Sequence, residues 1–410
     1  MLRRALASLV ELSVHRPRRS GGRRWVGPLV VGAGAMGCGA MLLASAAEPM
    51  ASEYVVFAYN ELGMHCMQSD FSEMMILPPF NNLRAQVVLK RTGEDPSIVT
   101  SGLTLKYTMP ANTHSTDKCN FWTHSQALLG ANLPPDVGLG GFGMSGTMAL
   151  VADQQFLATG IPVTPVDDNG RENPYVLATV TAELNGNVLG KTQAVVPVSW
   201  EMSCNLCHNT PGESVATTIL KAHDRLHGTT LEASKPVFCA QCHADPAVGS
   251  PGQPGVSNLS SAMHLAHAPR MAAAHLDNEC YACHPGFRTQ CQRDVHSLAG
   301  MNCNSCHTSM AAVGNPARTP WVDEPKCSDC HNRPEFQFEQ PGKLFRDSLG
   351  HQGVACMSCH GSPHAITPAS NAADNIQAIV KQGHAGVIDT CTVCHSSTPT
   401  ETFPHRRGDD

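Results

Sequence analysis

The chain is poor in the side chains that usually build a large core or a charged surface. Of its 410 residues, only 5% are aromatic and 15% are charged. A chain of this length must bury an extensive interior. The scarcity of aromatic residues therefore implies that something other than side chains fills part of that interior. The formal net charge of −6 argues against nucleic acid and against an anionic membrane surface as partners.

Positive charge is concentrated at the N-terminus, where the first 46 residues contain seven arginines and one glutamate. An apolar stretch over residues 25–47 and the small residues Ala44-Ser45-Ala46 complete the pattern of an export signal. We expect residues 1–47 to be a signal or targeting segment that is cleaved after Ala46. Two alternatives stay open, because the apolar stretch is long enough for a membrane anchor and Cys38 is a candidate for lipid attachment.

Cysteine, in contrast, is abundant. The 18 cysteines exceed what a reduced cytosolic protein carries. Fourteen of them occur in seven copies of Cys-X-X-Cys-His, which we number motif 1 to motif 7 along the chain. This spacing is the attachment signature of c-type haem, in which the two thiols bind the macrocycle and the adjacent histidine binds the iron. The chain therefore resembles the multihaem cytochrome c family, of the exported respiratory electron-transfer type.

The resemblance implies seven covalently bound haem c groups. The expected attachment sites are Cys204 and Cys207, Cys239 and Cys242, Cys280 and Cys283, Cys303 and Cys306, Cys327 and Cys330, Cys356 and Cys359, and Cys391 and Cys394. The expected proximal iron ligands are His208, His243, His284, His307, His331, His360 and His395.

The region that carries the motifs contains ten further histidines, three more than are needed to give every iron a second imidazole. Four of them precede a motif by five or seven residues, and this recurrence ranks them first as distal ligands. These four are His275, His296, His351 and His384. The expected set is completed by His227, His264 and His364, with His223, His267 and His405 in reserve. Motif 5 has no histidine between His307 and Cys327, so its distal ligand must come from far away in the sequence.

The chain divides into two regions with different sequence patterns. Residues 48–198 contain no motif, and segments such as YVVFAY, LTLKYTM and YVLATVTAEL predict strands, with a hairpin at Asn185-Gly186. Residues 199–410 are broken by glycine, proline and asparagine, and we expect helices near residues 214–226 and 259–274. The sequence predicts a β-rich N-terminal domain without haem, of sandwich type, followed by a seven-haem domain of short helices and loops.

The cysteines outside the motifs allow several interpretations. Cys66 and Cys119 are candidates for a disulfide in an oxidising compartment. Alternatively, His65, Cys119 and His124 have the types and order of ligands found in a blue-copper site. In a third interpretation, His65 is itself a distal haem ligand, in its own chain or in a neighbour. We expect Cys291 to be a buried free thiol.

Enough histidines for two imidazoles at every iron favour an electron carrier, acting in anaerobic or extracellular respiration from the periplasm or the cell exterior. Its expected partners are redox proteins or an external electron acceptor, and the spare histidines leave room for self-association into a filament. Membrane association is expected only if the N-terminal segment is retained or lipidated.

The alternative function is an oxidoreductase that acts on a small nitrogen or sulfur compound at one five-coordinate haem, with motif 5 as its candidate. Family signatures speak against it. All seven motifs end in histidine, whereas nitrite reductases of this kind have lysine in one motif. The only tyrosine after residue 199 is Tyr281, inside motif 3, so the cross-linked tyrosine of hydroxylamine-oxidising enzymes has no counterpart. A role as a binding module is less favoured, because the β-rich part has no row of aromatic residues.

Overall fold

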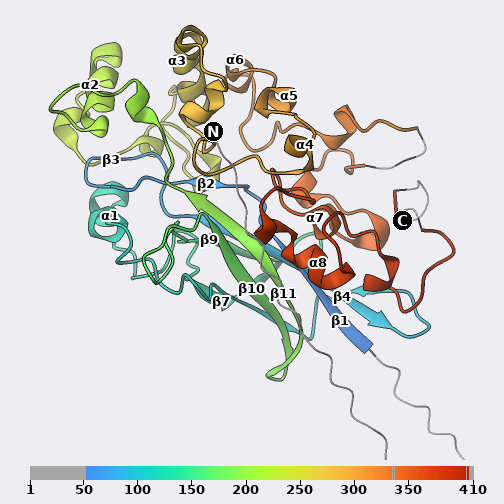
Figure 1. Ribbon diagram of the computed structural model, residues 1–410. Coiled ribbons are helices and arrows are strands. Elements are labelled where there is room, and N and C mark those ends of the chain that lie inside the picture. Colours follow the sequence, from blue (N-terminus) through green and yellow to red (C-terminus); the bar gives the residue numbers. More distant parts are fainter. Residues whose placement is uncertain (1–51, 335, 337, 403, 406–410) are drawn as a thin grey trace, which may run out of the picture. The chain divides into compact units, whose positions relative to one another are not determined.

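The computed structural model describes residues 52–334, 336, 338–402 and 404–405 (Figure 1). These residues belong to one compact unit, and the predicted signal segment lies outside them. Long strands occupy the chain up to Ser199, and short helices and turns follow. This order agrees with the predicted succession of a β-rich part and a part built of short helices.

Two five-stranded sheets form the β-rich part. The first contains, in spatial order, β1 (Ser52–Tyr59), β4 (Asn81–Arg91), β9 (Gln155–Ile161) and β8 (Ala149–Val151), with β5 (Ser97–Ile98) beside β4. The second contains β2 (His65–Cys66), β11 (Asn187–Ser199), β10 (Tyr175–Leu184), β6 (Thr104–Thr108) and β7 (Ser145–Thr147). Their pairings are antiparallel except for the parallel pair of β2 and β11, and β3 (Met74–Met75) also pairs in parallel with β12 (Val237–Phe238).

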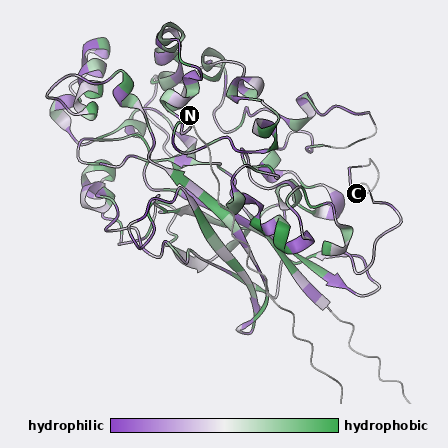
Figure 2. Cartoon of the chain, in the orientation of Figure 1, coloured by the Kyte–Doolittle hydropathy of each residue, from purple (hydrophilic) through white to green (hydrophobic). Residues whose placement is uncertain are grey.

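The two sheets share one hydrophobic core, and Figure 2 shows hydrophobic residues along their strands. Strand β10 illustrates the pattern, since its alternate residues from Val176 to Ala182 are buried while the residues between them are half-buried. The predicted hairpin is confirmed, because Asn185 and Gly186 connect β10 and β11 with positive φ angles of 50° and 82°. Gly190 of β11 lies so close to β1 that a Cβ atom there would be 2.4 Å from the Tyr54 carbonyl oxygen.

The outer face of strands β1 and β4 is covered as well. Val55, Phe57 and Tyr59 of β1 form a second hydrophobic cluster with residues from the C-terminal part of the chain. That cluster includes Met357 of motif 6 and Val393 of motif 7. Because both faces of β1 are covered, its apolar run is continuous rather than alternating.

A row of polar residues on the same face of β4 holds this C-terminal part by hydrogen bonds. Arg84 forms an ion pair with Glu61 and another, at 3.1 Å, with Asp347. The amide of the fully buried Gln86 donates to the Gly353 carbonyl oxygen at 3.0 Å and accepts from the Ala355 N–H at 2.8 Å. Lys90, four residues after Gln86 on the same face of the strand, donates to the Thr392 carbonyl oxygen. Alternate residues of one strand therefore fix the segments around motifs 6 and 7.

The α-helices are short, with at most 16 residues. They are α1 (Phe121–Leu129), α2 (Val215–His227), α3 (Leu259–Ala274), α4 (Val295–Leu298), α5 (Cys303–His307), α6 (Met310–Val313), α7 (Cys356–His360) and α8 (Ile376–Gln382). The two predicted helices are confirmed as α2 and α3, with Ser214 and Asn258 as N-caps that accept hydrogen bonds from the backbone. Within the described ranges, no helix combines the length and the apolar character needed to cross a membrane.

One buried carboxylate joins the end of the second sheet to the loop that follows motif 3. The Glu201 oxygens accept hydrogen bonds from the backbone N–H groups of residues 286–289 and from the Thr289 hydroxyl, at 2.5–3.3 Å. Burial alone would raise the pKa of Glu201, but these hydrogen bonds outweigh it and lower the pKa. The charged form is therefore the one that the fold stabilises.

We predict that Glu201→Gln lowers the free energy of unfolding by about 2–3 kcal/mol at neutral pH, because the charge-assisted hydrogen bonds are lost. A carboxylate with a depressed pKa contributes fully above its unfolded pKa and loses its contribution as the pH falls through the folded pKa. The difference between wild type and variant should therefore shrink in acid, which denaturant unfolding at several pH values would measure. The control is Glu172→Gln, whose more exposed ion pair with Arg288 should contribute less than about 1 kcal/mol. Equal losses in the two variants would contradict the assignment.

Candidate functional site

Each Cys-X-X-Cys-His motif folds as a single helical turn. Motifs 4 and 6 form α5 and α7, and the other five begin with 3₁₀ turns. In those five motifs the histidine N–H donates to the carbonyl oxygen of the first cysteine at 2.8–3.0 Å. Residues three and four positions apart lie on the same side of a helical turn. The turn therefore brings two thiols and one imidazole together at every motif.

Every motif histidine lies opposite a second histidine. The pairs are His208–His267, His243–His223, His284–His264, His307–His364, His331–His296, His360–His405 and His395–His351. The distances between ring centroids lie between 5.7 and 6.4 Å. No histidine is used twice, so the seven pairs take fourteen different side chains.

This separation fits two imidazoles that bind one metal ion from opposite sides. An imidazole nitrogen binds a transition metal at about 2 Å, and the ring centroid lies about 1.1 Å beyond it, so two such rings have centroids about 6.2 Å apart. The angle between the two rings is unrestricted, because each ring is free to rotate about its metal–nitrogen bond. The observed interplanar angles accordingly range from 19° to 81°.

The second requirement of a metal-binding histidine is that one ring nitrogen be held while the other faces the metal. On α3, Nδ1 of His264 lies 2.7 Å from the Ser260 carbonyl oxygen, and Nδ1 of His267 lies 2.7 Å from that of Met263. Nδ1 of His243 lies 2.8 Å from the Ser257 carbonyl oxygen. With Nδ1 as the donor, these rings keep the lone pair of Nε2 free for a metal.

Burial supports the neutral, metal-binding form of the rings. It lowers the pKa of His307 and of His360 to about 4, and the histidine opposite each of them adds to the effect. Both imidazoles are therefore uncharged at neutral pH, as ligation requires.

Two of the second histidines have a ring nitrogen that is buried without a partner in the described part of the chain. These atoms are Nδ1 of His351 and Nδ1 of His364. The backbone of His364 has a φ of 60°, which is uncommon for a residue with a side chain. Its ring lies against Gly63, where a Cβ atom would be 3.1 Å from Nδ1. The absence of a side chain at Gly63 thus makes room for His364.

The structure places four of the seven predicted distal histidines opposite a motif histidine. His264, His296, His351 and His364 each lie opposite a motif histidine. His264 faces motif 3, which is the nearest motif in the sequence, but the other three face a more distant one: His296 faces motif 5, His351 faces motif 7 and His364 faces motif 4.

The other three expected ligands lie elsewhere, and the reserves His223, His267 and His405 take their places. His275 is the exposed C-cap of α3, and His384 lies 3.4 Å from the carboxylate of Asp389. The ring of His227 lies 4.7 Å from that of His223, beside it rather than across from a motif. The spacing of His264 and His267, three residues apart on a predicted helix, was a signal that both lie on one face.

The motifs are also neighbours of one another. Helix α3 starts at motif 2, where the Leu259 N–H donates to the Ala244 carbonyl oxygen at 3.0 Å. The same helix carries His264, which faces motif 3, and one turn later His267, which faces motif 1. The Cys283 thiol of motif 3 has its pKa raised to about 11 by burial and, to a smaller extent, by the motif 1 thiols. Motifs 1, 2 and 3 are therefore grouped around α3.

From motif 3 onward the neighbours follow the order of the sequence. The Asn278 amide donates to the Cys303 sulfur at 3.9 Å, which places motif 3 against motif 4. Lys326, just before motif 5, lines the same cleft as Cys306 and His307, which places motif 4 next to motif 5. The ring of Phe338 lies 6.3 Å from that of His331 in motif 5 and 6.0 Å from that of His405, the histidine opposite motif 6, which places motif 5 next to motif 6.

The order continues to the last motif. The Ile388 N–H, just before motif 7, donates to the Cys359 carbonyl oxygen of motif 6 at 3.0 Å. Motifs 3 to 7 thus form one file that begins at the group around α3.

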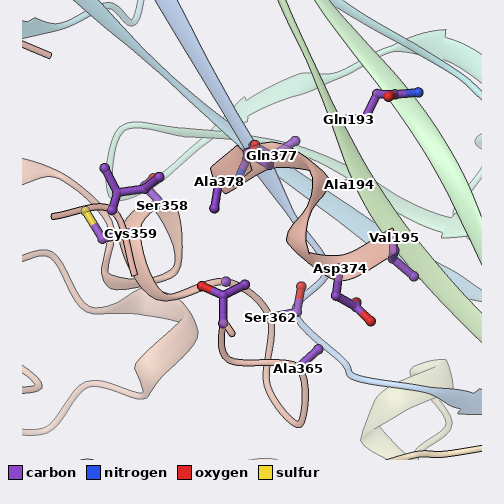
Figure 3. Close-up of a pocket in the computed structure, with 14 residues that line it drawn as sticks. Gln193, Ala194, Val195, Ser358, Cys359, Ser362, Ala365, Asp374, Gln377 and Ala378 are labelled. Atoms are coloured by element: carbon purple, nitrogen blue, oxygen red, sulfur yellow. The ribbon is translucent and has the colours of Figure 1, made fainter. Parts of the chain in front are cut away.

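Two cavities adjoin the motifs. A cleft of about 730 Å³ is lined by Cys306 and His307 of motif 4 and by the segments around Arg318 and Lys343. Its volume is in the range of sites that hold a cofactor or other organic ligand. A second cavity, of about 30 Å³, lies between α8, strand β11 and the motif 6 residues Ser358 and Cys359 (Figure 3). It is of the size that holds a water molecule rather than a substrate.

The expectations for the non-motif cysteines are met only in part. Cys66 and Cys119 are both free, so the predicted disulfide is absent. Burial raises the pKa of both thiols, and the neighbours Cys291, Cys283 and Glu201 raise that of Cys66 further, whereas a hydrogen bond from the backbone at the start of α1 lowers that of Cys119. Cys291 is a free thiol, as expected, and its side chain is half-buried. Burial raises its pKa to about 11.

The contacts of His65 favour neither of the roles proposed for it. Its Nε2 lies 2.8 Å from the Pro78 carbonyl oxygen, and its ring packs on Phe80. Among the described residues, no cluster of three or more histidine, cysteine or acidic side chains forms a metal site, which speaks against the copper interpretation. A haem iron would need no such cluster, because the macrocycle supplies most of its ligands.

Comparison with protein-family models, with curated proteins and with solved structures finds no match to this chain.

Proposed function

We propose that the chain is an exported electron-transfer protein that carries seven haem c groups, each with two histidine ligands. The observation that carries this proposal is the one-to-one pairing of seven motif histidines with seven other histidines, at ring separations of 5.7–6.4 Å. Chance does not account for seven independent pairs at the separation that one iron requires.

The residues have separate tasks in this proposal. The thiols of each motif attach the macrocycle, and the adjacent histidine presents Nε2 to the iron. The second histidine closes the opposite side, with Nδ1 held by a backbone carbonyl in His264 and His267. The cleft beside Cys306 and His307 is assigned to the group attached at motif 4. Bound haem supplies one-electron chemistry at a potential that its ligands and surroundings set.

Occupation of both axial positions favours electron transfer over catalysis, because no position is left for a substrate. Motif 5 was the candidate for an open iron, yet its His331 ring lies 6.1 Å from His296. The oxidoreductase alternative thus lacks a motif without a second histidine. The arrangement of motifs 3 to 7 in one file supports a role as a conduit between two redox partners, or between a partner and an external acceptor.

The proposed location is the periplasm or the cell exterior, where the N-terminal signal pattern and the haem motifs place such proteins. Anaerobic or extracellular respiration is the proposed setting. Self-association into a filament is compatible with this role, but a neighbouring copy need not supply a ligand, since each motif histidine has a partner in its own chain.

We predict that the purified protein contains seven covalent haems and that its ferric form is entirely low-spin. Haem quantification by the pyridine haemochrome method and mass spectrometry would give the number, and EPR would give the spin state. Added carbon monoxide should leave the ferrous spectrum unchanged. A high-spin haem in the wild type, or one that binds carbon monoxide, would support the oxidoreductase alternative instead.

We predict that His267→Ala converts one haem of the seven to a high-spin form that binds carbon monoxide, because His208 loses the ring opposite to it. The matched control is His275→Ala, eight residues along the chain and at the end of the same helix, which should keep seven low-spin haems. EPR and carbon monoxide difference spectra measure both variants. The opposite result, with the change in His275→Ala, would show that the pairing is misassigned.

A further inference from the structure

The fifth site differs from the others in what holds its second histidine. Nδ1 of His296 lies 3.2 Å from Oδ2 of Asp294, a carboxylate whose side chain is only 7% exposed. The other oxygen of Asp294 accepts a hydrogen bond from the Ser297 N–H at 2.9 Å, as the N-cap of α4. The carboxylate is thus fixed against the ring by the backbone of the next turn.

At the other second histidines described here, Nδ1 has an uncharged hydrogen-bond partner or none. His264 and His267 face backbone carbonyl oxygens, and His223 faces the Thr229 hydroxyl at 2.9 Å, which itself donates to a carboxylate. Nδ1 of His351 and Nδ1 of His364 have no partner in the described part of the chain. Among these six rings, His296 is the one in direct contact with a carboxylate.

A second carboxylate lies at the same site. Glu339 accepts hydrogen bonds from the backbone N–H of Cys327 and, at 3.2 Å, from that of Ser328. Burial opposes its ionisation, but the hydrogen bonds to Cys327 and Ser328 outweigh burial and lower the pKa of Glu339. Two carboxylates therefore lie at motif 5, one against the second histidine and one against the backbone of the motif itself. The cations that flank motif 5 in the sequence, Lys326 and Arg333, are both exposed to solvent.

We infer that Asp294 makes the haem at motif 5 the hardest of the seven to reduce. This inference rests on the proposed function. A carboxylate that accepts the Nδ1 hydrogen bond makes an imidazole a stronger electron donor, which stabilises the oxidised iron. The negative charge of Glu339 acts in the same direction, because reduction removes one positive charge from the iron.

The position of motif 5 gives this difference a consequence. It lies between motifs 4 and 6 in the file, so an electron that follows the file passes through it. A haem that is harder to reduce at this point separates motifs 1 to 4 from motifs 6 and 7. The haems of each group then accept electrons from the redox partner at their own end before any electron passes motif 5. The fifth site therefore sets the rate of electron transfer between the two ends.

The test is Asp294→Asn in the full-length holoprotein, followed by potentiometric titration with visible absorption and EPR as readouts. Asparagine caps a helix as well as aspartate does, so α4 is preserved while the charge on the His296 partner is removed. The most negative of the reduction steps should move to a less negative potential, and the other six should stay in place. Haem content and spin state should remain those of the wild type.

Asp277→Asn is the control, since Asp277 is exposed and lies beside motif 3; it should leave the most negative step unchanged. Glu339→Gln is the second variant, and it should move the same step in the same direction even if Asp294→Asn loses haem. An unchanged most negative step in both variants at motif 5 would overturn the inference. If the wild type lacked seven low-spin haems, the proposed function itself would fail, and the two failures are therefore distinguishable.

Discussion

Holding fourteen imidazole rings in seven pairs, with centroids 5.7–6.4 Å apart, is the constraint on which the rest of the structure depends. Side-chain packing alone is a weak means to this end in the C-terminal part. A hydrophobic cluster there, around Met271, Ala282 and Met310, contains only three buried residues. Hydrogen bonds between distant segments help to hold the rings in position instead. Among them is the bidentate pair of Arg293 and Asp374, at 2.6 and 2.8 Å. Because such bonds are directional, they determine ring positions more narrowly than apolar contacts do.

The β-rich part acts as the scaffold for this arrangement rather than as an independent module. Strand β1 is buried on both faces, one in the core between the sheets and one against motifs 6 and 7. A charged side chain at Phe57 would therefore disturb the segment that holds two motifs. The buried Gln86 shows the same dependence, since its amide satisfies backbone groups on both sides of residue 354.

The sequence revealed what is local and missed what depends on tertiary contacts. The attachment motifs, helices α2 and α3 and the hairpin at Asn185 follow from short-range patterns, and the structure contains these helices and this hairpin. The pairing of rings does not follow from such patterns, because His351 precedes motif 6 by five residues and yet faces motif 7. The expected disulfide failed for a related reason. An oxidising compartment indicates that thiols can be oxidised, but it does not indicate which two are adjacent.

The segment around Gly63 shows why the two parts of the chain depend on each other. The Asn60 N–H donates to the Ser362 hydroxyl at 2.9 Å, and Gly63 leaves space for the ring of His364. From the other side, the Arg293 N–H donates to the His364 carbonyl oxygen at 2.8 Å. The loop that presents His364 to motif 4 is thus held between the β-rich part and the segment before that motif. The part of the chain that carries no motif therefore helps to position the histidine that faces motif 4, and residues 199–410 on their own would lack one side of this support.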